Sequence, residues 1–467
     1  MIRIFNQYVS PKSLLLIGVE TVLIAVSLLL ATRLHFLNQA AGFTNYVRWP
    51  DFSLQILVVI VVLQICFYYS DLYDLSILRR HHQLVICLTE SLGAACLVLG
   101  VMYYAFPGLL LGHGIFFDGV SLVAVSTLAN RLALEHTWRF ASRKERILLL
   151  GTGELAAMVA REFSRRDDLN VELAGFVETA ESHGDKQFFG RPILGSADQL
   201  DALVAAHRIT RIVVALEDLR GILPVRALVR LRVQGIRVED GHSAMSALNG
   251  RIWLSEVKPS WFVFSDGFHR SRLTMLVKRI CDLAFSIIGL LVSLPIMLPL
   301  ALIIRLESPG PVIFRQSRVG LRGKTFELLK FRSMRADAEQ GTGAQWAQVN
   351  DPRVTRLGKY LRKFRLDELP QFINIIRGEM GFVGPRPERP VFVAQLRQSI
   401  SYYDERHSVR PGLTGWAQVQ YPYGASEEDA ARKLEYDLFY LKNMSIFFDC
   451  AIILQTVRHV CKGNGAR

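Results

Sequence analysis

Four long apolar runs in the first third of this 467-residue chain constrain its fold more than any other feature. They cover roughly residues 13–36, 52–70, 84–106 and 115–134. An α-helix needs about 20 apolar residues to cross the hydrocarbon core of a bilayer, and each run meets that length. Hydrophobic residues make up 51% of the chain and the mean hydropathy is +0.24, which is high for a soluble protein. The sequence therefore predicts a four-helix transmembrane domain over residues 1–144.

Basic residues around these runs predict their orientation. Arg3 and Lys12 precede the first run, residues 79–82 place two arginines and two histidines after the second, and residues 139–146 are basic after the fourth. The other two loops carry almost no positive charge. Because Lys and Arg favour the cytoplasmic side, we expect both ends of this domain in the cytoplasm. A removed signal peptide is not expected, since no small-residue cleavage site follows the first run.

Three acidic residues, Glu20, Glu90 and Glu135, lie in or beside the apolar runs. Ionisable residues inside a bilayer are functional candidates, but a structural position facing the helix interior or the headgroups is the favoured interpretation. The six cysteines show no CxxC or Cys/His spacing, so neither disulfides nor a zinc site is predicted.

From residue 145 the pattern changes to strands that alternate with helices, which predicts a Rossmann-like, doubly wound parallel domain over residues 145–250. Gly151 and Gly153 lie in a GxGxxA turn between the first strand and its helix, where a pyrophosphate can approach a helix N-terminus. Either Glu172 or Glu178 fits the ribose-binding acid. The same glycines also serve any sharp turn of this fold, so a structural or regulatory domain is favoured over a cofactor site. A linker is expected over residues 251–275.

A fifth apolar run at about residues 278–305 has spanning length but contains Pro295 and Pro299. A proline inside a helix removes a hydrogen bond, and Ser293 is placed to satisfy a freed carbonyl. Both flanks are basic, which favours a re-entrant helix hairpin that enters and leaves the same leaflet. A kinked helix that crosses the membrane is the alternative.

After this run, arginine and lysine recur beside glycine and proline turns, and the chain as a whole has a net charge of +13. Rigid turns that present guanidinium groups suit phosphate recognition, whereas a solvated basic surface is the simpler interpretation. No nucleic-acid-binding motif is present, so nucleic acid is not an expected partner. The candidate phosphate-binding residues are Lys330, Arg332, Arg362, Arg365, Arg386 and Arg410.

Asp367 and Glu368 lie among these cations, just before a helix that Pro370 is expected to open and Gly378 to end. Acids in that position usually cap backbone N–H groups. A metal site is a second possibility. A third is covalent catalysis, because surrounding cations would reduce the repulsion between a carboxylate and a diphosphate.

The segment from about residue 276 to the C-terminus resembles the bacterial sugar transferases, which are monotopic polyprenyl-phosphate phosphoglycosyl transferases. The resemblance rests on "KFRSM", "DPRVTRLGKYLRKFRLDELPQF", "GFVGPRP", "RPGLTGWAQV" and "KLEYDLFYLKNMS", which occur in this order over some 190 residues. The transmembrane and Rossmann-like domains before it are similar to the large form of this family. "PSWFVFSDGF" further resembles the branch associated with exosortase (PEP-CTERM) systems.

This resemblance implies a mainly α catalytic domain over residues 276–467 that transfers a sugar 1-phosphate from a UDP-sugar to undecaprenyl phosphate. The implied mechanism passes through a covalent phosphoglycosyl aspartate, releases UMP and requires Mg2+. Asp367 matches the nucleophile and a candidate metal ligand, and Glu368 matches its partner in acid/base chemistry or metal binding. The resemblance also implies initiation of exopolysaccharide, capsule or O-antigen synthesis at the bacterial inner membrane, on its cytoplasmic face. Inner-membrane lipids and a second copy in a homodimer are expected partners. In the family a Ser-Pro pair often lies at the hairpin break, whereas here Leu294 separates Ser293 from Pro295.

Two other functions stay open from the residues alone. An NAD-dependent nucleotide-sugar oxidoreductase or epimerase would use the glycine turn, but the α/β segment lacks the Tyr-x-x-x-Lys pair that such enzymes need. A non-enzymatic membrane scaffold would use the basic region only to bind anionic lipid, and it predicts that Asp367→Asn has no effect.

Overall fold

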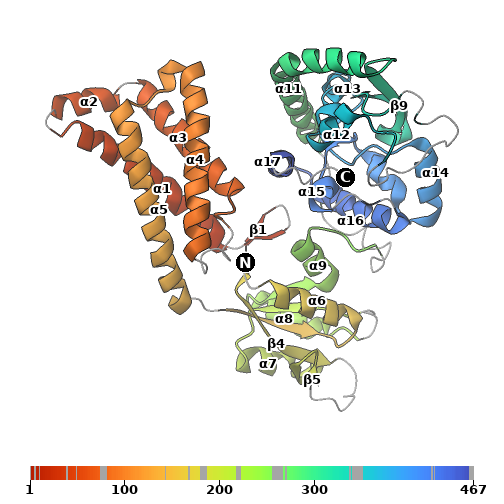
Figure 1. Cartoon of the computed structure of the whole chain (residues 1–467). Helices are drawn as coiled ribbons and strands as arrows, with labels where there is room; N and C mark the ends of the chain where they lie inside the picture. Colours follow the sequence, from red (N-terminus) through yellow and green to blue (C-terminus); the bar gives the residue numbers. More distant parts are fainter. Residues whose placement is uncertain are drawn as a thin grey trace. The chain divides into compact units, whose positions relative to one another are not determined.

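A computed structural model of the chain consists of two compact units, Tyr8–Glu239 and Asp240–Arg467 (Figure 1). The predicted boundary at residue 250 differs from this division, because helix α9 (Gly241–Asn249) belongs to the second unit. There the indole N–H of Trp416 donates to the carbonyl of Gly250 at 2.7 Å. The structure describes residues 2–4, 7–9, 11–37, 40–48, 50–73, 81–141, 144–166, 169–178, 187–216, 222–254, 267–268, 271–335, 338, 351–421, 424 and 426–461.

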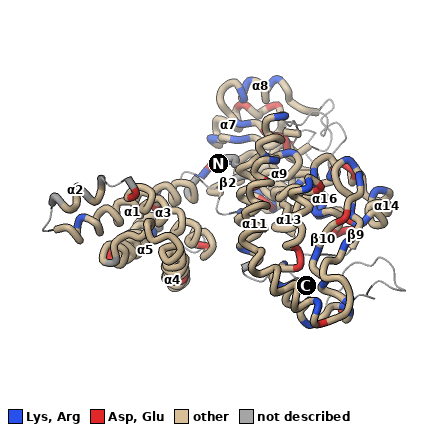
Figure 2. The backbone as a smooth tube through the Cα atoms, turned by 90° about the horizontal axis from the view of Figure 1, so that it is seen from above, with Lys and Arg blue, Asp and Glu red and all other residues tan. Residues whose placement is uncertain are grey.

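The N-terminal part of the first unit is helical. A short two-stranded sheet, β1 (Ile2–Ile4) and β2 (Gln7–Val9), precedes it. Each predicted apolar run forms a helix that is long and apolar enough to span a membrane, and α2 was not predicted. Figure 2 shows few charged positions along these helices. The helices are α1 (Pro11–His35), α2 (Ala40–Arg48), α3 (Pro50–Tyr69), α4 (His81–Ala105) and α5 (His113–Ala141), with a 3-10 turn η2 (Pro107–Leu109) before α5.

A buried ion pair joins α1 to α5. Glu20 and Arg131 are both fully buried, and Nε of Arg131 donates to Oε1 of Glu20 at 2.8 Å. Nη1 of Arg131 donates to the carbonyl of Leu72. Glu20 therefore has a structural partner, as the favoured interpretation requires. Glu90 is exposed on α4, and the side chain of Glu135 lies outside the described residues.

The α/β part of this unit is a six-stranded sheet in the order β5-β6-β4-β3-β7-β8, parallel from β6 through β7. The predicted strands form, and the sequence prediction missed only β5 and β6, whose segment contains Pro192 and Gly195. The strands are β3 (Glu145–Leu150), β4 (Val171–Glu178), β5 (Gln187–Phe188), β6 (Arg191–Ser196), β7 (Arg211–Val214) and β8 (Arg237–Asp240). The helices are α6 (Glu154–Arg165), η4 (Ala197–Gln199), α7 (Leu200–Ala206) and α8 (Val225–Val233).

The second unit is mainly helical, and its described residues form a large apolar cluster and two smaller ones. It also contains an antiparallel pair, β9 (Ile313–Val319) with β10 (Thr325–Phe331), and a parallel pair, β11 (Gly381–Val383) with β12 (Gly412–Thr414), neither of which was predicted. Its helices are α11 (Arg272–Glu307), α12 (Arg356–Lys363), α13 (Gln371–Arg377), α14 (Pro390–Ser399), α15 (Trp416–Gln420), α16 (Glu427–Asn443) and α17 (Ile446–Cys461), with 3-10 segments η5 (Leu321–Gly323), η6 (Leu366–Glu368) and η7 (Tyr403–Ser408).

Helix α11 is a continuous element of 36 residues that contains Pro295 and Pro299, and Figure 1 shows that it bends along its length. Its length and composition also meet those of a membrane span, so the re-entrant hairpin stays a prediction. The hydroxyl of Ser293 donates to the carbonyl of Leu290 at 3.2 Å. This carbonyl precedes that of Leu291, which Pro295 deprives of its usual donor.

Candidate active site

The Asp367-Glu368 pair lies in a sharp turn between two helices. Arg365, two residues before Asp367, has a left-handed backbone with φ of 54°, which is uncommon for a non-glycine residue. The turn continues as η6, and Pro370 then opens α13. Asp367 and Glu368 are buried, with exposed fractions of 8% and 7%. The acids therefore lie just ahead of the helix rather than inside its first turn.

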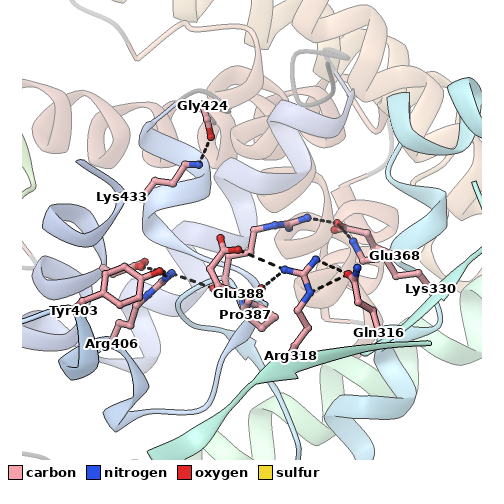
Figure 3. A network of polar contacts seen from close by, with 12 residues as sticks. Gln316, Arg318, Lys330, Glu368, Pro387, Glu388, Tyr403, Arg406, Gly424 and Lys433 are labelled. Atoms are coloured by element: carbon pink, nitrogen blue, oxygen red, sulfur yellow. Dashed lines mark hydrogen bonds and ion pairs between the residues drawn. The ribbon is translucent and has the colours of Figure 1, made fainter. Parts of the chain in front are cut away.

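Glu368 is held by three cations from three different segments, and Figure 3 shows its contact with one of them, Lys330. Its Oε1 accepts from Nη2 of Arg386 at 2.7 Å and from Nζ of Lys330 at 3.4 Å. Its Oε2 lies 3.6 Å from Nη1 of Arg365. Burial alone would raise the pKa of Glu368, but the charges of Arg386, Lys330 and Arg365 hold it well below its usual range. Glu368 is thus a fixed anion in the centre of a basic cluster.

Asp367 differs from its neighbour because its carboxylate makes no hydrogen bond or ion pair with any residue that the structure describes. Burial raises the pKa of Asp367 above its ordinary value, and the negative charge of Glu368 adds to this effect. The nearby charges of Lys330, Arg362 and Arg386 offset only part of the increase. An unpaired carboxylate with a raised pKa is more basic than an ordinary Asp and is free to reach an incoming group.

The cations outnumber the carboxylates in this cluster. Lys330, Arg362, Arg365 and Arg386 surround two acids, which leaves a net positive charge. Lys330 comes from β10, and burial lowers the pKa of its ammonium group. A cluster with more cations than carboxylates suits a phosphate ligand.

The position of Arg386 depends on two backbone segments that cross closely, at Gly384 after β11 and at Gly412 in β12. The N–H of Gly384 donates to the carbonyl of Thr414, and the N–H of Gly412 donates to the carbonyl of Pro385, both at 2.9 Å. A Cβ on Gly384 would lie 2.5 Å from the carbonyl oxygen of Arg410. Two backbones can cross this closely only without side chains, and the crossing fixes the turn that carries Arg386.

A second support for this turn was not found from the sequence. Arg406 is buried, and its Nη2 donates to the carbonyl of Arg386 at 3.0 Å and to Asp437 at 2.8 Å (Figure 3). Its Nη1 donates to the hydroxyl of Tyr403 at 2.6 Å. Arg406 comes from η7 and Asp437 from α16, so three segments that are distant in the sequence meet at the turn that carries Arg386. The "KLEYD" and "RHSVRPG" motifs that contain Asp437 and Arg406 were the available signal.

Arg318 extends the cluster along β9. Its Nη2 donates to Gln316 at 2.6 Å, and its Nη1 donates to the carbonyl of Pro387 at 3.0 Å and lies 3.5 Å from Glu388 (Figure 3). The sequence marked Arg318 only as one of several basic residues. The β9–β10 pairing places it next to Phe326, on the strand beside that of Lys330.

Two predicted phosphate-binding residues lie elsewhere. Arg332 is buried and donates to the carbonyls of Ile304, Ser308 and Pro309, so it caps the C-terminal end of α11. Arg410 donates to the carbonyl of Gly378 at 3.0 Å, at the C-terminal end of α13. The Asp-Glu pair precedes the other end of that helix, so the structure does not bring Arg410 into contact with it. Both guanidinium groups therefore have structural partners.

Arg362 remains a candidate for ligand binding. It lies in the last turn of α12, its Nε donates to the hydroxyl of Ser333 at 3.1 Å, and its charge acts on Asp367. The prediction that this arginine belongs to the site is consistent with that position.

Within the described residues, no group of three or more His, Cys, Asp or Glu side chains is placed to hold a metal ion. Both oxygens of Glu368 face cations, so Asp367 is the carboxylate left to bind one. Mg2+ commonly uses one or two carboxylates together with substrate phosphates. The residues therefore fit a Mg2+ ion only when a diphosphate supplies further oxygens.

The glycine turn of the α/β part forms as predicted, and it belongs to the other unit. Gly151 has φ of +120°, and a Cβ there would lie 2.5 Å from the carbonyl oxygen of Ala215. Gly153 precedes α6 as its N-cap. The close approach of two strand ends is a sufficient structural reason for Gly151.

Comparison with known proteins gives matches over both parts of the chain. Residues 273–463 match the bacterial sugar transferase family, and residues 69–238 match a family described as a CoA-binding domain. A UDP-N-acetylgalactosamine-undecaprenyl-phosphate N-acetylgalactosaminephosphotransferase of Aeromonas hydrophila is 40% identical over 277 residues, which are 59% of this chain and 62% of that protein.

Two further relatives share the similarity. A UDP-glucose:undecaprenyl-phosphate glucose-1-phosphate transferase of Xanthomonas campestris pv. campestris is 32% identical over 74% of this chain and 73% of its own length. An exopolysaccharide production protein PSS of Rhizobium leguminosarum bv. phaseoli is 39% identical over 41% of this chain and 100% of its own length.

Proposed function

Because the chain belongs to the bacterial sugar transferase family, we propose that it transfers a sugar 1-phosphate from a UDP-sugar to undecaprenyl phosphate. The products are undecaprenyl-diphosphate-sugar and UMP. The observation that carries this proposal is the unpaired, buried carboxylate of Asp367 beside a cluster with excess positive charge. A diphosphate is the anion that such a cluster attracts.

In the first step, a carboxylate oxygen of Asp367 attacks the phosphorus that bears the sugar. The bond from this phosphorus to the bridging oxygen breaks, and UMP leaves with that oxygen. The result is a phosphoglycosyl aspartate, and the cations around it balance the charge that develops on the phosphoryl oxygens. The raised pKa of Asp367 supports this role because a more basic carboxylate is a better nucleophile.

In the second step, a phosphate oxygen of undecaprenyl phosphate attacks the same phosphorus. The bond to Asp367 breaks, which restores the carboxylate and completes the lipid diphosphate. Since UMP has left, the two phosphate substrates use the same cluster one after the other. No net proton transfer is needed in either step.

Glu368 serves in this proposal as a positioning anion rather than as an acid or base. Its low pKa leaves it ionised throughout, and it holds Lys330 and Arg386 against each other's repulsion. Acid/base chemistry, as the family resemblance also allowed, would need a carboxyl group that exchanges protons near neutral pH. Arg362 and Arg386 then contact phosphate oxygens.

Mg2+ is the proposed cofactor, held by Asp367 and the substrate's diphosphate. When bound, it would neutralise phosphate charge and thus assist the departure of UMP. Arg386 and Lys330 keep their own contacts with Glu368 and do not depend on the ion.

The membrane arrangement supports the same function. Five apolar helices indicate a membrane-associated protein, and we propose that the catalytic unit lies on the cytoplasmic face of the bacterial inner membrane. In this arrangement α11 forms the re-entrant hairpin, and the transmembrane helices form a four-helix bundle. The exposed apolar side chains Phe447, Leu454 and Val457 of α17 suit contact with the lipid surface. The proposal also includes a role in the pathway: the enzyme initiates the synthesis of exopolysaccharide, capsule or O-antigen. It further assigns the chain to the exosortase-associated branch of the family and expects a homodimer.

The test incubates the purified protein with UDP-glucose or UDP-N-acetylgalactosamine, Mg2+ and undecaprenyl phosphate, and measures UMP release. Turnover that persists in a folded Asp367→Asn variant would refute the covalent mechanism. A phosphoglycosyl adduct on Asp367, trapped without acceptor and located by mass spectrometry, would support it. An oxidoreductase would instead change the absorbance of NADH with a UDP-sugar.

A further inference from the structure

The amino-terminal edge of the six-stranded sheet joins the starts of three strands. The N–H of Thr210, just before β7, donates to the carbonyl of Arg146 in β3 at 3.0 Å. The N–H of Arg237, the first residue of β8, donates to the carbonyl of Thr210 at 3.2 Å. Because β3, β7 and β8 are neighbours in this order, their starts and the turns before them form one continuous surface.

Exposed cations lie along this surface. They are Lys144 before β3, Arg208 before β7, Arg232 in the last turn of α8, and Arg237 at the start of β8. We call these four residues the basic edge. Figure 2 shows basic positions along α8. The four residues come from separate segments, so the basic edge exists only in the folded domain.

The acids nearest to this surface have arginine partners of their own. Oε1 of Glu145 lies 2.9 Å from Nη2 of Arg211, and Oε2 of Glu239 lies 3.6 Å from Nη1 of the same buried arginine. Oε1 of Glu172, one of the two acids considered for a ribose, lies 3.5 Å from Nη2 of Arg146. The described cations around these strand starts therefore outnumber the acids, and the surface has a net positive charge.

An exposed apolar side chain lies beside the basic edge. Val233, the last residue of α8, is 84% exposed, whereas Leu228 and Leu231 of the same helix are buried. Valine favours a helix less than alanine or leucine does, and a side chain this exposed gains little from packing. Elements that lie at a bilayer surface combine cations with apolar side chains that enter the headgroup region. Val233 next to Arg232 has this combination.

The chain itself keeps this surface near the membrane. The candidate span of α5 ends at Leu134, the helix ends at Ala141, and β3 begins at Glu145. From Leu134 to Ala141 the helix rises about 10 Å, and the connection to β3 reaches at most about 14 Å. The start of β3 therefore stays within about 25 Å of the hydrocarbon core. β8 is two strands away, about 10 Å across the sheet.

We propose that the basic edge docks the α/β domain on a bilayer surface that carries anionic lipid headgroups, with Val233 entering the headgroup region. The occupant follows from charge complementarity and from the tether, since lipid headgroups surround the end of α5 at high effective concentration. The attraction acts over about one Debye length, so the contact weakens as the salt concentration rises. The inference needs α5 to span the membrane and does not depend on the proposed catalytic step.

The test uses the full-length protein in lipid nanodiscs and follows amide hydrogen exchange by mass spectrometry. One set of discs contains phosphatidylcholine alone, and in the other about a third of the lipid is phosphatidylglycerol. Peptides that cover residues 205–211 and 230–238 should exchange at least about threefold more slowly in the anionic discs, because docking suppresses local opening. Peptides of α6 should exchange equally in both and serve as the internal reference.

Three results of this comparison would overturn the proposal. The first is equal exchange of the two peptides in neutral and anionic discs. The second is protection in anionic discs that persists at high salt. The third is equal protection in neutral discs after inorganic phosphate is added, which would assign the basic edge to a soluble anion instead of a lipid surface.

Variants locate the contact. Arg208→Gln combined with Arg232→Gln should abolish the protection in anionic discs, and Val233→Ser should reduce it by a smaller amount. Arg226→Gln is the matched control, since this exposed arginine lies in the first turn of the same helix, about 9 Å along its axis from Arg232. Full protection in the double variant, or an equal loss in the control, would refute the proposed surface. All four side chains are exposed, so the variants should fold, and the readout does not depend on UMP release.

Discussion

Buried acids occur in two regions of this molecule, and they have opposite surroundings. In the N-terminal helices, Glu20 faces Arg131, so one anion is matched by one cation and both are fully buried. In the C-terminal unit, Asp367 and Glu368 face a larger number of cations, and Asp367 has no described partner. A balanced pair neutralises its own charge, so removing one partner leaves an uncompensated buried charge. An unbalanced cluster stores positive charge for a ligand and is expected to reduce stability in exchange for function.

The largest expected effect comes from removing the unpaired carboxylate. Asp367→Asn should reduce UMP release by about 10⁴-fold or more, since a covalent nucleophile is lost. Thermal unfolding of the variant should not occur at a lower temperature than for the wild type, because the burial of this charge is unfavourable in the folded state. Asp404→Asn, at an exposed ion pair with Arg397, is the control and should release UMP at the wild-type rate.

Breaking the pair of Glu20 and Arg131 should reduce stability and leave UMP release unchanged. Arg131→Met leaves Glu20 buried without its cation, which should cost about 3–5 kcal/mol of stability. Turnover per folded molecule should stay unchanged. The measurement is denaturation in detergent, followed by UMP release from the folded fraction.

A double variant makes this prediction sharper. Glu20→Leu combined with Arg131→Met removes both charges, and it should be more stable than Arg131→Met alone. If the double variant is no more stable than the single one, the two side chains do not act as a pair.

A smaller effect is expected from one cation of the unbalanced cluster. Arg386→Gln should reduce UMP release about 10²-fold, because one donor to the phosphoryl oxygens is lost. Arg397→Gln is the matched control. Its ion pair with Asp404 has the same 2.7 Å distance as that of Arg386 with Glu368, but both of its side chains are about half exposed. Equal losses in the two variants would contradict a special role for the cluster.

The smallest effect is a change with pH. Asp367 must be ionised to attack, and its pKa is raised, so UMP release should begin to fall at a higher pH than for an ordinary Asp of pKa 3.8. Stability linked to the same group changes in the other direction. The pKa of Asp367 is higher in the folded chain than in the unfolded chain. The contribution of this residue to stability is therefore fully present below the unfolded pKa and is lost as pH rises through the folded pKa.

Initial rates between pH 4 and 8 test this sign. Glu368→Gln removes the negative charge that helps to raise the pKa of Asp367, so the acid limb of its weaker activity should move to lower pH. An acid limb that moves to higher pH in this variant would show that another group controls the profile.

The sequence predicts those features whose signal lies within one segment. The membrane helices, most α/β strands and the cluster around Asp367 belong to this class, because apolar period and charge pattern are local. Contacts between side chains that are far apart in the sequence leave no such local signal. Glu20 and Arg131 are 111 residues apart, and nothing in either segment identifies the other as its partner.

The contacts of Arg332 and Arg410 also depend on residues far away in the sequence. Arg332 and Arg410 have the same residue type as Arg386, but each caps a helix end. Only the three-dimensional path of α11 and α13 shows that those carbonyls lie within reach. Charge alone therefore does not tell which arginines donate to backbone carbonyls at a helix end and which face the Asp-Glu pair.

The close crossing of the backbones at Gly384 and Gly412 limits where the preference for one UDP-sugar over another can be altered by protein engineering. No residue larger than glycine fits at these two positions, because a Cβ atom at either one would clash with backbone atoms. Randomised libraries should therefore leave both glycines fixed. Gln316 and Arg318 lie on strand β9, which pairs with β10 in a separate sheet, and their side chains can be replaced without forcing two backbones apart. A search for variants with a new UDP-sugar preference should begin there.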